Sequence, residues 1–230
     1  MPMTRITKDT GATIKPGPMV VAAPEQIMTD AVLDQVAAGT GLNGPFVADL
    51  LASAATHEND GISLFRALSS MTANPVLLAR YQQFQAESEA AVDAYEQLIA
   101  DLGGRIGYVS PPGRMTEAMD AKILEAFLGS GSADPMTLEL KGVEAVLLAA
   151  TLCVANVSLL SAIAEGLDEG EAKTALLVAV VKLEGPAREH LEWATSTQRT
   201  MVLTQANSKL AQKVGAAMEG VVSKIKDALR

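Results

Sequence analysis

Aromatic side chains are scarce in this sequence of 230 residues. Phe, Tyr and Trp together make up 3% of the chain, although 49% of its residues are hydrophobic. A core of this composition is filled by Ala and aliphatic side chains, which favour closely packed helices over a sandwich of strands. We therefore predict an all-α fold.

Cysteine and histidine are also scarce. The single cysteine, Cys153, cannot form an internal disulfide bond, so no oxidising compartment is implied and we expect a cytoplasmic protein. Cys153 lies in an apolar run, and we interpret it as a small buried residue rather than as a nucleophile. With two histidines, the chain shows no evident Ser/His/Asp or Cys/His catalytic grouping.

Positive charge is limited, with 18 Lys and Arg against 27 Asp and Glu and a net charge of −9. Such a surface repels phosphates, so we predict no specific nucleic-acid partner. Residues 199–230 are the exception, with six basic residues, two acidic ones and an apolar stripe at helical spacing. We predict a basic amphipathic C-terminal helix, which packs on the rest of the protein, on another subunit or on a membrane surface.

One long hydrophobic run requires a choice between core and membrane. Ala145–Ala164 contains no charged residue and is about as long as a membrane-spanning helix. It has no basic flank or aromatic belt, so we predict a central helix that is buried on all sides, and no transmembrane span. Three prolines, Pro16, Pro18 and Pro24, interrupt the N-terminal apolar patch, so we expect no signal peptide.

Hydrophobic periodicity predicts four long helices arranged as two antiparallel hairpins. Their expected ranges are 45–71, 75–102, 136–165 and 171–198. A helix from Thr116 to Phe127 and a linker over 129–135 form the crossover between the hairpins. Pro186 is expected to kink or break the last of the four helices.

These elements divide the chain into three regions. Residues 1–44 are expected to be extended with one short helix, residues 45–198 form the bundle, and residues 199–230 form the C-terminal helix.

Two stretches of sequence resemble the ferritin-like superfamily, in its rubrerythrin-like and bacterial stress-associated branches. Residues 50–104 resemble the first hairpin of that family; they begin LLASAATHENDGISLF and end AYEQLIADLGG. Residues 171–194, which end in REHLEWA, resemble its closing helix. The resemblance covers about residues 45–198. It implies a ferritin-like four-helix bundle and a stress-related role.

The resemblance also implies a centre of two iron or manganese ions. In that family two helices each provide one Glu and two others each provide Glu-x-x-His, all pointing inward. Here Glu58 matches the first glutamate and His190 matches one histidine, while Glu87 and Glu184 are the nearest carboxylates in the second and fourth helices. Other expected ligand positions hold residues that bind metal poorly: Ser88, Ala91, Ala155, Asn156 and Ala187.

The candidate metal ligands are therefore Glu58, Glu87, Glu184 and His190, a set better suited to one weakly bound ion than to two. A bundle without metal is an equally open alternative. In that case a buried Glu58 needs a partner, and His190 or Arg66 is available. The neighbouring His57 is expected to be exposed, because it points to another face of the helix.

Two functions follow as hypotheses. The first is a non-catalytic binding or scaffold protein that kept the bundle and lost the metals. The second is an iron- or manganese-dependent oxidase or iron-handling protein with an atypical site. In both cases we expect a homo-oligomer, a dimer or larger, or a complex with a related ferritin-like subunit.

Overall fold

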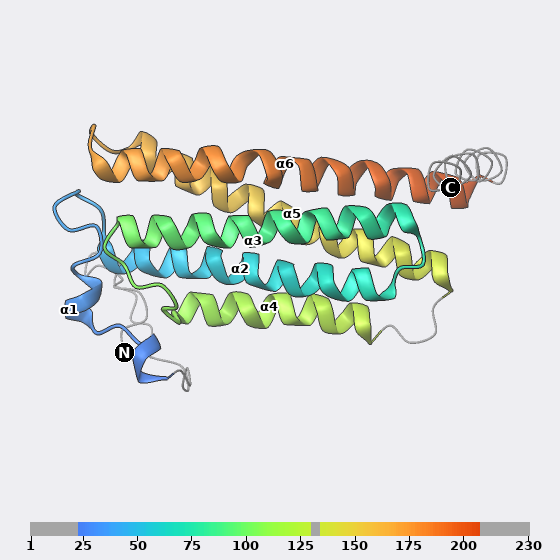
Figure 1. Cartoon of the computed structure of the whole chain (residues 1–230), viewed down its shortest axis with the longest axis horizontal. Helices are drawn as coiled ribbons and strands as arrows, with labels where there is room; N and C mark the ends of the chain where they lie inside the picture. Colours follow the sequence, from blue (N-terminus) through green and yellow to red (C-terminus); the bar gives the residue numbers. More distant parts are fainter. Residues whose placement is uncertain (1–22, 130–133, 208–230) are drawn as a thin grey trace, which may run out of the picture.

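The computed structural model describes residues 23–129 and 134–207, and over these ranges the protein is all-helical, without strands (Figure 1). The prediction of an all-α fold is confirmed for this part of the chain. Most of the predicted N-terminal extension and of the basic C-terminal helix, residues 1–22 and 208–230, lies outside the described residues.

The helices follow in chain order. They are the 3-10 helix η2 (Pro24–Gln26) and the α-helices α1 (Asp30–Leu33), α2 (Gly44–Met71), α3 (Pro75–Asp101), α4 (Pro111–Leu128), α5 (Pro135–Glu165) and α6 (Glu171–Ala206). The four predicted long helices correspond to α2, α3, α5 and α6, and the predicted crossover helix corresponds to α4. Two bounds differ clearly from the prediction, at the start of α4 and at the end of α6.

Local capping chemistry sets where helices begin. The side chains of Asn43, Asn74, Ser110 and Asp134 each accept a backbone hydrogen bond in the first turn of α2, α3, α4 and α5. A proline follows each cap at one of the first two helical positions, where the missing N–H costs nothing. In α4 the Ser110 hydroxyl accepts from Gly113 N at 2.9 Å, so the helix begins five residues before the predicted Thr116.

Pro186 does not break α6. The helix runs continuously from Glu171 to Ala206, although Pro186 lies inside it. The turns on both sides are fixed by buried residues, Leu183 and Ala187, so packing outweighs the loss of one backbone hydrogen bond. The same continuity carries α6 past the predicted end at residue 198.

The long helices form two antiparallel hairpins. α2 packs against α3, and α5 packs against α6. The hairpins meet where α2 contacts α5 and where α3 contacts α6, and α5 crosses obliquely behind the other helices in Figure 1. α4 lies along α2 and also touches α5, so it closes one side of the assembly while connecting the two hairpins.

The prediction that Ala145–Ala164 is buried on all sides is wrong. Only 28% of the most apolar stretch of α5 is buried, and Leu148 and Leu159 are 58% and 49% exposed. In two packed hairpins each helix turns one face to the core and the opposite face outward, whatever its composition. Within the described residues α5 is the one helix long and apolar enough to cross a membrane, and the absence of a transmembrane span stays a prediction.

Candidate functional site

The four predicted ligands lie in three separate places. Glu58 is buried in the middle of α2, whereas Glu87 on α3 and His190 on α6 meet each other. Glu184 lies on the outer surface of α6, where its carboxylate accepts hydrogen bonds from Arg188 Nε at 2.9 Å and Nη2 at 2.7 Å. The structure therefore brings two of the four side chains together.

His190 is enclosed by protein side chains. Its Nε2 lies 2.7 Å from Glu87 Oε2, and its ring lies 3.9 Å from the Phe84 ring and 5.7 Å from the Phe65 ring, centroid to centroid. Burial lowers the pKa of His190, and the opposing hydrogen bond and charge of Glu87 do not cancel that effect. The ring is thus neutral at pH 7, and its Nε2–H donates to the Glu87 carboxylate.

Glu58 is 6% exposed, as the sequence predicted, but its partner is Cys153 on α5. The Cys153 thiol donates to the Glu58 carboxyl, and burial raises the pKa of both groups. Both partners expected for Glu58 pair elsewhere: His190 pairs with Glu87, and Arg66 lies on the surface beside Glu89.

The residue of α5 that faces Glu58 also differs from the prediction. The expected positions were Ala155 and Asn156, but Ala155 is exposed and Asn156 is half-buried, while Cys153 is buried. Two residues along a helix rotate a side chain by about 200°, so this error places the predicted ligand position on the wrong face of α5.

A second polar group lies between α2 and α4, and we call it the acidic pocket: His57, Asp60, Glu117 and Asp120. These residues line a cavity of about 200 Å³. The prediction that His57 is exposed is wrong, because the residue is 2% exposed. α4 covers this face of α2, a contact that the helix pattern of α2 alone does not reveal.

Both ring nitrogens of His57 face hydrogen-bond acceptors. Nδ1 lies 2.7 Å from Asp120 Oδ2, and Nε2 lies 3.0 Å from the Ala149 carbonyl oxygen. Burial disfavours a charged ring, but the hydrogen bond and charge of Asp120, with smaller contributions from Ala149 and Glu58, outweigh it and raise the pKa of His57. An imidazolium that donates from both nitrogens fits this geometry.

The negative charge of Asp60 is unfavourable in the acidic pocket. Burial, followed by the negative charges of Asp120 and Glu117, raises its pKa to about 6, against the attraction of His57. Its Oδ2 atom is buried without a hydrogen-bond partner. The acidic pocket therefore holds one ion pair and one carboxyl group that takes up a proton in mildly acidic solution.

The residues present do not fit a di-metal centre. That centre requires carboxylates and imidazoles from four helices around one cavity. Within residues 23–129 and 134–207 no group of three or more His, Cys, Asp or Glu side chains is arranged to hold a metal ion. The Glu58 carboxyl is hydrogen-bonded to the Cys153 thiol, His190 is hydrogen-bonded to Glu87, and Glu184 faces solvent.

Comparisons with known proteins identified no relative of this chain: no family model, no curated protein and no solved structure matches it. The function is therefore inferred from the contacts, burial and charge described above.

The acidic pocket was missed at the level of sequence, although a signal for it exists. His57 and Asp60 are three residues apart on α2, and Glu117 and Asp120 are three residues apart on α4. Each pair shares one face of its helix. Nothing in the sequence, however, states that these two faces meet.

Proposed function

We propose that this protein is a non-catalytic helical scaffold with a ferritin-like arrangement, whose function is to bind another protein chain. The observation that carries this proposal is the enclosure of His190, the residue best matched to a family ligand. Its Nε2 is engaged by Glu87, and Phe84 and Phe65 cover its ring. An imidazole held in this way supports packing rather than metal binding.

The order and packing of the helices support the ferritin-like part of the proposal. Two antiparallel hairpins, α2–α3 and α5–α6, are joined through α4, and each helix of the first hairpin contacts one helix of the second. This matches a bundle of two hairpins with one long crossover connection.

The interior chemistry supports the loss of the metals. A cluster of inward carboxylates requires cations to neutralise it, because unpaired charge is costly in a protein interior. Here α5 presents Cys153 and α6 presents Ala187 to the core, and the raised pKa of Glu58 favours its neutral form. Such an interior does not require a bound cation for charge neutralisation.

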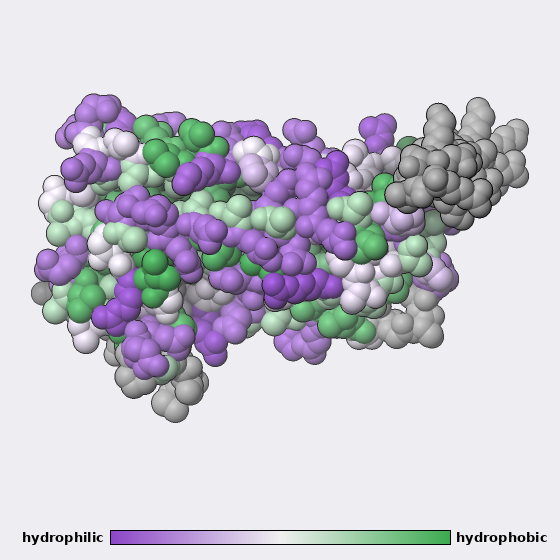
Figure 2. Space-filling model, in the orientation of Figure 1, coloured by the Kyte–Doolittle hydropathy of each residue, from purple (hydrophilic) through white to green (hydrophobic). Residues whose placement is uncertain are grey.

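The surface supports a binding role. Exposed apolar side chains occur on the outer faces of α5 and α6, among them Leu148, Leu159 and Val181, the last of which is 80% exposed. Figure 2 shows hydrophobic residues over the N-terminal half of α6 on an otherwise largely hydrophilic face. Apolar patches on soluble proteins commonly mark interaction sites.

Metal content tests the proposal. Full-length protein produced with added iron or manganese is expected to carry well below one ion per chain by elemental analysis. It is also expected to show no Fe(II) oxidation above buffer and to keep its thermal midpoint in chelator. About two ions per chain, or chelator-sensitive stability, would overturn the proposal in favour of the metal-dependent oxidase.

Matched variants assign any metal that is found. Glu58→Ala and His190→Ala remove the two best-matched ligands, and Glu184→Ala removes a surface carboxylate as the control. Asp60→Asn reports separately on the acidic pocket. Metal lost in the first two variants and retained in Glu184→Ala would establish the oxidase-type site, whereas metal lost only in Asp60→Asn would reflect attraction to the acidic pocket.

A further inference from the structure

α5 carries two rows of small and aliphatic residues at the spacing of a coiled coil. The inner row is buried: Val143, Val146, Ala150, Cys153, Val157, Leu160 and Ala164. The outer row follows the same alternation of three and four residues: Leu148, Leu152, Ala155, Leu159 and Ala162. Such a spacing keeps a row of side chains facing a partner helix.

The outer row has no partner helix within the described residues. Leu148 and Leu159 are 58% and 49% exposed, Ala155 and Ala162 are exposed, and Leu152 is half-buried. The other exposed residues between them, Thr151 and Ser158, are also uncharged. A solvent-facing helix surface normally carries charged and polar side chains, so this row has the composition of a covered surface.

We propose that a second copy of this chain covers the outer row, with the two α5 helices antiparallel about a two-fold axis between Leu152 and Ala155. Around that point Leu148, Leu152, Ala155 and Leu159 are spaced by four, three and four residues, which reads the same in both directions. Leu148 then faces Leu159 of the partner subunit, and Leu152 faces Ala155 of the partner subunit. Alanine allows the two backbones to approach closely at the axis, and the two leucine pairs pack outside it.

Charge at the ends of α5 favours the antiparallel orientation. Lys141, which also pairs with Glu144 on its own helix, precedes the outer row and Glu165 follows it, and both are exposed. The proposed register brings Lys141 beside Glu165 of the partner subunit, twice per dimer. A parallel pair would place lysine against lysine and glutamate against glutamate, which is unfavourable.

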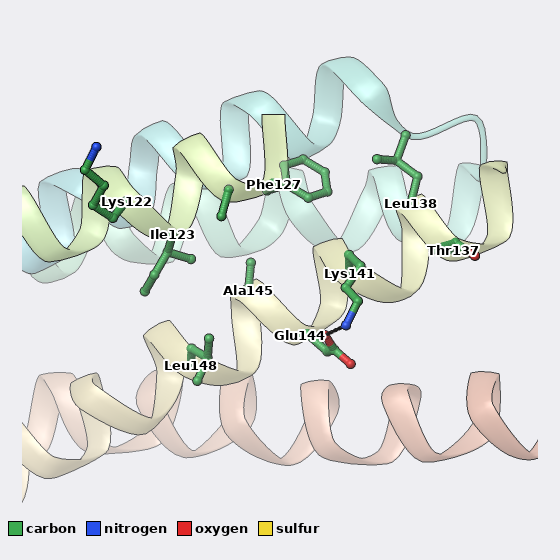
Figure 3. Close-up of a pocket in the computed structure, with 10 residues that line it drawn as sticks. Lys122, Ile123, Phe127, Thr137, Leu138, Lys141, Glu144, Ala145 and Leu148 are labelled. Atoms are coloured by element: carbon green, nitrogen blue, oxygen red, sulfur yellow. Dashed lines mark hydrogen bonds and ion pairs between the residues drawn. The ribbon is translucent and has the colours of Figure 1, made fainter. Parts of the chain in front are cut away.

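The groove between α4 and α5 extends the proposed interface beyond one row. It has a volume of about 610 Å³, and Figure 3 shows Ile123 and Phe127 on α4 opposite Ala145 and Leu148 on α5. The apolar stretch of α5 that contains the outer row is twenty residues long, or about 30 Å, which by itself is a narrow contact surface. A stable dimer buries about 800 Å² on each chain, so this adjoining apolar surface is needed to reach that area.

The proposed dimer covers Leu148 and Leu159, which also support the binding role, but it does not depend on the absence of metal from the interior. The outer row faces away from the interior residues Glu58 and His190, so a bundle that binds metal would present the same surface. Metal content and oligomeric state therefore test the two proposals separately.

The mass of the full chain in solution, measured by light scattering after size exclusion, tests this inference. The parent protein is expected to contain two chains of 24.0 kDa. Leu148→Lys and Leu159→Lys are each expected to halve the mass, because a charged lysine replaces a leucine that packs against the partner. Val181→Lys, at a more exposed apolar position on α6, is the matched control and is expected to remain dimeric. Helix content by circular dichroism confirms folding.

Charge reversal tests the register. Lys141→Glu and Glu165→Lys are each expected to weaken the dimer about tenfold, since two symmetry-related pairs are lost. The double variant is expected to recover most of the parent affinity, an outcome that a general loss of stability does not produce.

Three results would overturn the inference. The first is a parent dimer that persists in both leucine variants. The second is a monomeric parent that becomes a dimer after truncation at Asn207, which would mean that the C-terminal segment of the same chain covers the outer row. The third is a parent that remains monomeric, whether or not it sediments with phosphatidylcholine vesicles; sedimentation would identify a membrane as the occupant.

Discussion

The imidazole of His57 on α2 links this helix to two helices much later in the chain, with Nδ1 2.7 Å from Asp120 Oδ2 on α4 and Nε2 3.0 Å from the Ala149 carbonyl oxygen on α5. Neither acceptor donates a proton, so the arrangement favours a doubly protonated ring. His190, in contrast, is buried between aromatic rings with a single acceptor, Glu87. The pKa of the same residue type is therefore shifted in opposite directions at the two positions.

The two histidines are expected to titrate on opposite sides of pH 6.5, their ordinary pKa, with His57 above it and His190 below. Because the chain has only two histidines, their ring proton signals in NMR spectra recorded across pH are readily separated. His190→Gln assigns the signals. The reverse order, or two titrations at 6.5, would contradict the geometry.

Removing the charge of Asp120 is expected to weaken the fold most in acidic solution. Because the pKa of His57 is raised in the folded protein, its contribution to stability is complete below pH 6.5 and is lost as pH rises through the folded pKa. Asp120→Asn should therefore lower the free energy of unfolding by about 2 kcal/mol near pH 6 and by less near pH 9. Urea unfolding at both pH values measures this, and an equal loss at the two would count against an ion pair.

Neutralising Asp60 is expected to stabilise the protein at neutral pH. A carboxyl group with a pKa of about 6, raised from 3.8, lowers stability as pH rises from 3.8 to about 6, and that loss persists above it. Asp60→Asn should raise the free energy of unfolding by roughly 1 kcal/mol near pH 7.5, a value reduced for solvent screening of a half-buried group, and by little near pH 4.

A second variant tests why the pKa of Asp60 is raised. Glu117→Gln removes one of the negative charges that raise the pKa of Asp60, so the pKa measured by NMR should fall toward 3.8. No change in that pKa would mean that Glu117 does not act on Asp60.

The buried Tyr95 and the half-buried Tyr108 are expected to respond differently to loss of the hydroxyl group. Tyr95 Oη is buried with no hydrogen-bond partner, whereas Tyr108 Oη donates to Asp49 Oδ1 at 2.9 Å. Tyr95→Phe should leave the free energy of unfolding unchanged or raise it by up to about 1 kcal/mol. Tyr108→Phe should lower it by about 1–2 kcal/mol, because the buried Asp49 carboxyl loses its donor.

Thermal or urea unfolding compares the tyrosine variants directly. A loss above about 1 kcal/mol in Tyr95→Phe would indicate that this hydroxyl has a partner in solution, such as a buried water molecule.

The starts and ends of most helices were predictable because they depend on neighbours in the chain. Asn74 followed by Pro75 begins α3 through a hydrogen bond from Val76 N to Asn74 Oδ1, and both residues are visible in the sequence. Burial of Glu58, Ser88 and Cys153 was also predictable, since each lies within an apolar stripe. Pro186 shows the limit of such local rules, because packing on both sides keeps α6 continuous.

The candidate sites were predictable only in part, because a site depends on which helix faces meet. The helix that contains His190 was foreseen, but its pairing with Glu87 required α3 to lie against α6. His57 was expected to be exposed because the sequence does not state that α4 covers it. Glu184 lies on the same helix as His190, but its side chain points to solvent and binds Arg188.

For the part of the chain that the structure describes, the sequence by itself determined the all-helical class and most helix boundaries, because caps, prolines and hydrophobic periodicity act within a few residues. The tertiary structure alone decided the chemical partners: Glu58 with Cys153, His190 with Glu87, and His57 with Asp120. It also decided that the outer row of α5 remains uncovered within one chain. The physical reason is that the residues of an apolar helix do not distinguish its core-facing side from its outer side. Only packing against the other helices decides which side is buried.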